Sequence, residues 1–168
     1  MFKNIEKNLI LKKQTADNKD FLLSLYSSAR EDELNMTTLT LLEKRRFLKQ
    51  QFELRELDYS KKFSDAQFLI IYRKKSPIGR MVYNISDVVH LIDIAFVKRS
   101  RSRGFGSLLI EHLIQSAEDS KKLFRLSVAT HNMRAIKLYQ KLGVEIKKEK
   151  NGYFTMYRDV MRESSSNK

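Results

Sequence analysis

The stretch Val88-Val-His-Leu-Ile-Asp-Ile-Ala-Phe-Val97, followed by Arg101-Ser-Arg-Gly-Phe-Gly-Ser107, decides the predicted fold. The first segment is almost continuously apolar, which is typical of a buried strand, and the second is a basic glycine loop. A further strand is expected over residues 123–128, so the centre of the sheet is a strand, helix, strand unit. The helix between them carries apolar residues at the spacing of one face, namely Leu109, Ile110, Leu113, Ile114 and Ala117.

The N-terminal part predicts a strand and two helices. The strand is expected over residues 8–14, and Asp17 is expected to cap the first helix. Thr40 and Glu43 have the spacing of a capping box that opens the second helix. The first helix has an apolar face made of Phe21, Leu22, Leu25, Tyr26 and Ala29. The second has Leu41, Leu48 and Phe52 near one face.

The remaining elements complete a mixed sheet. Residues 68–72 and 78–83 predict a hairpin, and a helix over residues 132–142 ends at Gly143, a natural C-cap. Two last strands, 144–148 and 153–159, flank the turn dipeptide Asn151-Gly152. The order predicts an α/β (α+β) fold: a mixed, mostly antiparallel sheet with a central parallel β-α-β unit and helices on both faces.

Composition favours a cytoplasmic protein with one domain. The chain has 168 residues, of which 42% are hydrophobic, and we expect a single domain over residues 1–162 with a polar tail at 163–168. There is no cysteine, which excludes disulfides, thiolate nucleophiles and thiolate metal sites. The N-terminus does not resemble a signal peptide, and no apolar run approaches the roughly 20 residues that span a bilayer. No membrane association is expected.

The formal net charge of +13 attracts phosphate in any form, whether nucleic acid, anionic lipid or a nucleotide cofactor. Lysine used as a generic surface residue explains much of this excess, so charge alone does not select a partner. A homodimer is also compatible with the sequence.

The glycine loop has the features of a pyrophosphate site. It lies between a strand and a helix N-terminus, where backbone amides and the helix dipole favour an anion. Gly104 and Gly106 allow close backbone approach, while Arg101 and Arg103 add positive charge. Two alternatives remain open, a tight turn with solvated arginines and a nucleic-acid patch, although the second leaves the glycines unexplained.

These residues resemble the GNAT acetyltransferase superfamily, whose signature Arg/Gln-x-x-Gly-x-Gly/Ala is matched by Arg101, Gly104 and Gly106. The stretch Asn132-Met-Arg-Ala-Ile-Lys-Leu-Tyr-Gln-Lys-Leu-Gly143 is similar to the family's second motif, Asn-x-x-Ala-x-x-x-Tyr-x-x-x-Gly-Phe, with Val144 in place of the final Phe. The resemblance is close over residues 66–160, and it implies a GNAT fold and acetyl-CoA as co-substrate, with no metal.

The resemblance also implies which residues bind the cofactor. The pantetheine arm would pair with the strand at Phe96 and Val97, and the pyrophosphate would lie on the amides of the loop. Asn132 would contact the cofactor from the second motif. The implied cofactor-binding set is Phe96, Val97, Arg101, Ser102, Arg103, Gly104, Phe105, Gly106, Ser107, Asn132 and Tyr139.

Two residues are candidates for proton transfer. Tyr139 occupies the family's position for donation to the departing thiolate, and a phenol with an ordinary pKa of about 10 is protonated at neutral pH. Asp93 is the one carboxylate in an apolar run, where an unpaired charge is costly, and it is a candidate base for the amine. Tyr139 as a core residue, Asp93 as an outer-face residue, and a water chain as the base remain alternatives.

The histidines provide no metal site. His90 is expected at the start of its strand, and His131 precedes Asn132 near the expected thioester position. Neither has an identifiable partner, and the three histidines of the chain lack metal-ligand spacing.

The acceptor is the least determined part of the sequence. The resemblance implies that the connection between the first two helices forms a wall of the acceptor pocket, and Arg30-Glu-Asp-Glu33 is acidic enough to attract a cationic amine. The candidate acceptor residues are Tyr26, Arg30, Glu31, Glu33, Gln51 and Tyr72. The leading hypothesis is acetyl transfer to a small-molecule or amino-acid-like primary amine. Acetylation of a protein or an aminoacyl-tRNA, and a non-catalytic acyl-CoA-binding module, are the alternatives.

Overall fold

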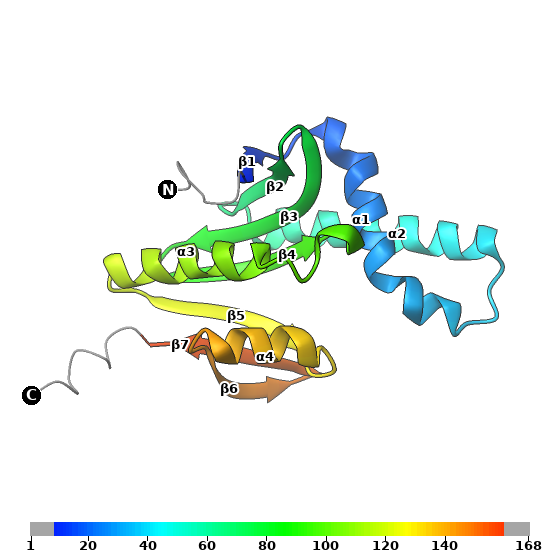
Figure 1. Ribbon diagram of the computed structural model, residues 1–168. Helices are drawn as coiled ribbons and strands as arrows, with labels where there is room; N and C mark the ends of the chain where they lie inside the picture. Colours follow the sequence, from blue (N-terminus) through cyan, green and yellow to red (C-terminus); the bar gives the residue numbers. More distant parts are fainter. Residues whose placement is uncertain (1–8, 160–168) are drawn as a thin grey trace, which may run out of the picture.

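The computed structural model describes residues 9–159, whose strands form one seven-stranded sheet of order β1-β2-β3-β4-β5-β7-β6 (Figure 1). The predicted order of elements and the mixed sheet are confirmed. In chain order the elements are β1 (Leu9–Lys13), the 3-10 turn η2 (Ala16–Asn18), α1 (Lys19–Asn35), α2 (Leu41–Lys62), β2 (Gln67–Arg73), β3 (Ser76–Ile85), β4 (Val88–Phe96), the 3-10 turn η3 (Lys98–Ser100), α3 (Phe105–Asp119), β5 (Leu123–Ala129), α4 (Met133–Lys141), β6 (Glu145–Lys150) and β7 (Tyr153–Arg158).

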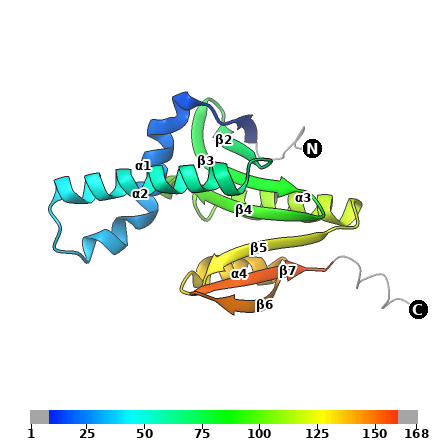
Figure 2. The same ribbon diagram turned by 180° about the vertical axis from the view of Figure 1, so that it is seen from behind.

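Helices cover both faces of the sheet, as predicted. In Figure 1, α3 and α4 lie in front of the sheet and α2 lies behind it, and the reverse view in Figure 2 places α2 in front. β4 and β5 are parallel, while every other neighbouring pair of strands is antiparallel. No helix among residues 9–159 combines the length and apolarity needed to cross a bilayer.

Alternation along the strands divides the buried residues into two cores. On β2, Ile71 faces the larger core beneath α3 and α4, and its neighbour Ile70 faces a smaller core formed with α1 and α2. The predicted apolar face of α3 is buried throughout, with Leu113 fully enclosed. In the smaller core, Leu22 and Tyr26 of α1 pack with Phe52 of α2. The sheet is therefore held rigidly from both sides.

Local signals set most element ends. Glu43 N–H donates to Thr40 Oγ1 at 3.3 Å and Thr40 N–H donates to Glu43 Oε2 at 2.8 Å, which confirms the predicted capping box. Asn151 and Gly152 have φ values of +53° and +75°, and they form the predicted turn between β6 and β7. Gly143, with φ +73°, follows the end of α4.

One local prediction is wrong, and one apolar residue of α2 is not buried. Asp17 is not the N-cap of α1, because it lies inside the 3-10 turn η2 that precedes the helix. The N-cap of η2 is Thr15, whose N–H donates to Asn18 Oδ1 at 2.9 Å. Leu41 does not join Phe52 in the core but is 66% exposed, since the first turns of α2 extend past the sheet (Figure 2). Residue 8 and the predicted tail at 163–168 lie outside the described residues.

His90 predicts a pH dependence of stability. Burial, with the positive charge of Arg125 adding, lowers the pKa of His90 from 6.5 to about 4. Between these values the unfolded chain binds a proton that the folded chain does not, so stability falls as the pH drops from about 6.5 to 4. A His90→Gln variant lacks this contribution. We expect its urea midpoint to fall less than that of the parent protein over this window, and parallel pH curves for the two proteins would contradict the expectation.

Candidate active site

A gap between β4 and β5 creates the site. The two strands pair in parallel from Val88↔Leu123 to Leu91↔Leu126, and the described pairing ends there. Beyond this point each strand follows its other neighbour: β4 stays with β3 up to Phe96↔Gly79, and β5 stays with β7 up to Ala129↔Tyr153. The edge of β4 that faces the gap therefore has backbone groups without a strand partner in the described sheet.

A bulge on β4 helps to open this gap. Tyr83 pairs with Leu91 and Val82 pairs with Asp93, which leaves Ile92 as an extra residue on β4. A bulge bends its strand and increases the local twist. It also resets the alternation, so Asp93 lies on the α2 side of the sheet, within 3.8 Å of Arg55, while Ile94 and Phe96 pack against the core beneath α3.

The glycine loop exposes the N-terminus of α3 toward the gap. Gly104 is the N-cap with φ +76°, a conformation that favours glycine, and it supplies no capping side chain. The first amides of the helix are therefore open to an anion. A Cβ at Gly106 would meet only Phe96, at 3.6 Å, so the fold has room for a side chain there. Arg101 Nε donates to the carbonyl of Phe96 at 2.9 Å and ties the loop to β4.

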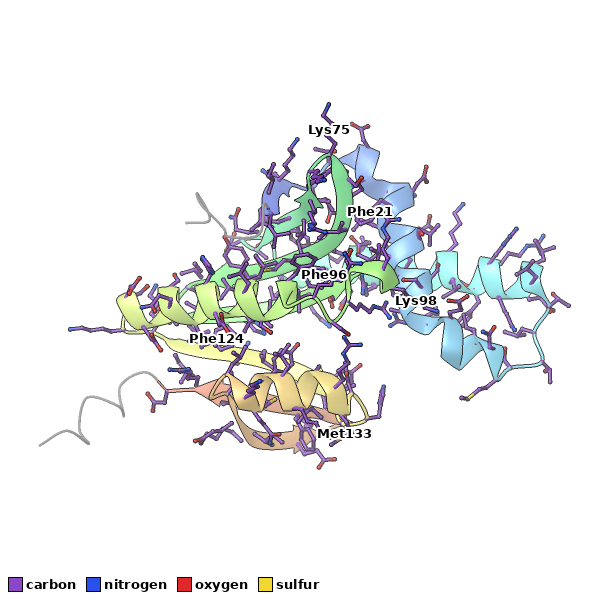
Figure 3. The ribbon with its side chains drawn as sticks, viewed as in Figure 1. Phe21, Lys75, Phe96, Lys98, Phe124 and Met133 are labelled. Atoms are coloured by element: carbon purple, nitrogen blue, oxygen red, sulfur yellow. The ribbon has the colours of Figure 1, made fainter. Side chains whose placement is uncertain are left out.

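A cleft of about 670 Å³ runs along this loop. Figure 3 shows Phe96 at the end of β4 and Met133 at the first turn of α4, on opposite sides of the gap. Every predicted cofactor-binding residue lines the cleft except Val97, which packs against the core. The lining residues are Ala29, Ile94, Ala95, Phe96, Ser100, Arg101, Ser102, Arg103, Gly104, Phe105, Gly106, Ser107, Ile110, Asn132, Arg134, Ala135, Leu138 and Tyr139.

Arg134 is a cleft residue that sequence reasoning missed. Its Nη2 donates to Ser102 Oγ at 2.6 Å, which links the start of α4 to the glycine loop across the cleft. Arg134 occupies a position of the second motif where any residue is allowed. The one signal in the sequence that could have indicated it is its place two residues after Asn132. Asn132 Oδ1 itself accepts from Ala135 N–H at 3.2 Å and caps α4.

A second cavity, of about 210 Å³, opens on the other side of the gap. Ile94, Asn132 and Tyr139 line both cavities, so the two are neighbours on either side of these residues. The other residues of the second cavity come from α2, β4, β5 and β7, and they are Tyr59, Leu91, Ile92, Asp93, Leu126, Ser127, Val128, Ala129 and Tyr153. Tyr59 and Tyr153 are therefore further candidates that the sequence did not single out.

Tyr139, which lines both cavities, is 8% exposed. Burial raises its pKa to about 12, and the negative charge of Asp93 adds to this effect. The phenol is therefore protonated at neutral pH and available as a donor.

Asp93 lines the second cavity and carries an oxygen without a donor. Its buried Oδ2 has no hydrogen-bond partner in the described residues, and the nearest cation, Arg55 Nη2, lies 3.8 Å away, beyond hydrogen-bond distance. Such an oxygen costs free energy unless a ligand or solvent supplies a donor.

A buried ion cluster behind Asp93 anchors α2 to the sheet. Arg80 of β3 is 1% exposed, and its Nη1 donates to Glu56 Oε1 at 2.6 Å. Arg55 Nη2 donates to the same oxygen at 3.4 Å, and its guanidinium lies over the rings of Tyr26 and Tyr59. Removing one partner of a buried ion pair costs about 3–5 kcal/mol, so this cluster fixes the position of α2 beside Asp93.

The six residues expected in an acceptor pocket lie outside both cavities where their side chains are described. Tyr26 is buried in the smaller core with Arg30 over its ring at 3.9 Å, and Glu31 pairs with Lys98. Gln51 lies on α2, and the hydroxyl of Tyr72 on β2 accepts from Asn18. The side chain of Glu33 is outside the described residues.

The two histidines of interest lie apart. His90 is on β4, where Arg125 Nη2 lies 3.2 Å from its Nδ1 and Phe63 packs against its ring. His131 is exposed and directly precedes Asn132. Neither lines the cleft or the second cavity.

Comparison with known proteins identifies the family. The model of the acetyltransferase (GNAT) family matches residues 28–144. The chain therefore belongs to this family, whose members are acetyl-CoA-dependent N-acetyltransferases. No curated protein sequence matches the chain.

Solved structures share the fold at low identity. The PaiA N-acetyltransferase of Thermoplasma acidophilum, in complex with coenzyme A, is 16% identical with a TM-score of 0.66, covering 90% of this chain and 98% of that one. An acetyltransferase of Thermus thermophilus is 18% identical with a TM-score of 0.65, covering 90% and 96%. Ard1 of Thermoplasma volcanium is 20% identical with a TM-score of 0.59, covering 91% and 98%.

Gly79 provides a test of the cleft geometry. A Cβ at this position would lie 2.4 Å from the Ala95 carbonyl oxygen and 2.9 Å from Phe96 Cδ1, so Gly79→Ala must displace the end of β4. We expect a lower melting temperature and weaker coenzyme A binding by calorimetry. Ser76→Ala, at the start of the same strand, is the control. Unchanged coenzyme A affinity in Gly79→Ala would show that the end of β4 does not shape the site.

Proposed function

We propose that this protein transfers the acetyl group of acetyl-CoA to the primary amine of a small molecule, by direct transfer in a ternary complex. The observation that carries the proposal is that two neighbouring cavities share Tyr139 as a lining residue. One cavity has the features of a nucleotide-cofactor site, and the other has a carboxylate and room for a second substrate. Direct transfer requires both reactants at one point, which this arrangement supplies.

The residues of the cleft fit acetyl-CoA. The open amides at the start of α3 suit a pyrophosphate, with Arg101, Arg103 and Arg134 adding positive charge. The unpaired edge of β4 suits the amide groups of the pantetheine arm. The bound cofactor would supply an activated thioester near Tyr139.

Tyr139 would stabilise the departing sulfur. Because a thiol is a stronger acid than a phenol whose pKa is about 12, full proton transfer to sulfur is unfavourable. Tyr139 would instead donate a hydrogen bond to the negative charge that develops on sulfur. Such donors act strongly in a water-poor site, where removing one costs about 100-fold or more in rate.

Asp93 would prepare the amine. Asp93 lines the second cavity, where its carboxylate would hold and orient the amine. When the neutral nitrogen bonds to the carbonyl carbon it becomes a strong acid, and Asp93 would take the proton it loses. The carbon–sulfur bond then breaks, and the released thiolate takes a proton from solvent. The amine would lie between Asp93 and Tyr139, which contribute opposite steps of the transfer.

A Tyr139→Phe variant tests the proposal. The ring keeps its packing, so we expect an unchanged melting temperature and KM for acetyl-CoA, with kcat lower by about 100-fold because the sulfur loses its donor. The measurement is thiol release from acetyl-CoA with a panel of primary amines. Tyr72→Phe, at a residue that lines neither cavity, is the matched control. A full rate in Tyr139→Phe would remove this residue from the mechanism.

A further inference from the structure

The second cavity has the chemistry of a cation site. Asp93 is the one charged residue among its described lining residues, and it is negative. Three tyrosines, Tyr59, Tyr139 and Tyr153, are also among its lining residues. Aromatic faces and a carboxylate both attract an ammonium group, and the rings also accept an alkyl chain. Tyr153, which is 55% exposed, lies toward solvent and marks the open side of the cavity.

The two arginines behind Asp93 do not reverse this charge. Arg80 pairs with Glu56 at 2.6 Å. Arg55 lies between Glu56 at 3.4 Å and Asp93 at 3.8 Å. Two guanidinium groups therefore balance two carboxylates, which offsets the charge of Asp93 without reversing it. Neither arginine lines the cavity, whereas Asp93 does. The exposed basic residues of the surface act weakly here, because salt screens charges beyond about 8 Å at physiological ionic strength.

The cavity is also small. Its volume of about 210 Å³ is below the roughly 300–1,000 Å³ of typical ligand pockets, so it accommodates a short chain. A carboxylate on the carbon next to the amine would therefore be held close to Asp93. Two negative charges would then lie close together with no cation in the described lining to pair with the second, which is unfavourable.

We propose that the acceptor is a short aliphatic primary amine without a carboxylate next to the amino group, and that Asp93 selects it against free α-amino acids. This inference rests on the proposed function, because it places the acceptor in the second cavity. The sequence analysis treated small amines and amino-acid-like amines as one class of acceptor, and this inference favours the small amines.

Three acceptors of related shape test the selection: isobutylamine, valinamide and valine. Valinamide and valine have the same size and differ in the charge beside the amine. We expect the parent protein to prefer valinamide over valine by about 100-fold in kcat/KM, measured by thiol release, since like charges brought together cost several kcal/mol. Isobutylamine should be accepted as well.

Valinamide and valine also differ in the intrinsic reactivity of their amines. This difference is the same for the parent protein and for Asp93→Asn, so it cancels when the two proteins are compared. In this variant the preference for valinamide over valine should fall at least tenfold, whatever the change in absolute rate. Asp87→Asn, at an exposed position before β4, is the matched control and should keep the preference. Equal use of valine and valinamide by the parent protein, or a preference unchanged in Asp93→Asn, would overturn the inference.

Binding separates this inference from the proposed function. If no amine released thiol although acetyl-CoA bound, transfer to small amines would be wrong. The selection is then measured by calorimetry on the protein saturated with coenzyme A. Binding of isobutylamine and valinamide but not valine would support the cation site, and equal binding or none would contradict it.

Discussion

The end of parallel pairing at Leu91↔Leu126 is the constraint on which the site depends. Had β4 and β5 continued side by side, their backbone groups would satisfy each other and the sheet would be closed. Instead each strand is held by its antiparallel neighbour, and the bulge at Ile92 turns β4 away. The gap supplies an unpaired strand edge beside the open N-terminus of α3, and Tyr139 stands in it as a lining residue of both cavities.

The two faces contribute different chemistry to this gap. On the side of α3 and α4, backbone amides and basic residues form a cleft suited to a phosphate-bearing cofactor. On the side of α2, a carboxylate and tyrosines form a small cavity suited to a cation. The ion cluster of Arg80, Glu56 and Arg55 ties α2, which supplies Tyr59 to the second cavity, to the sheet.

The sequence predicted the elements and the cleft better than the second cavity. The glycine loop, the capping box and the motif from Asn132 to Gly143 are local signals, and each lies where it was expected. Three other features join distant parts of the chain. They are the contact of Arg80 with Glu56, the hydrogen bond of Arg134 with Ser102, and the close approach of Gly79 to the end of β4. No periodicity encodes such contacts, and the residues first expected around the acceptor, such as Tyr26 and Tyr72, belong to α1 and β2 packing instead.

The central claim is that one substrate reaches Tyr139 from each cavity. A conjugate of coenzyme A joined through an acetyl linker to isobutylamine spans both cavities and tests this claim by calorimetry. The account predicts that the conjugate binds at least about 100-fold more tightly than coenzyme A alone, because the second group binds intramolecularly. Equal or weaker binding of the conjugate would contradict the connection between the two cavities.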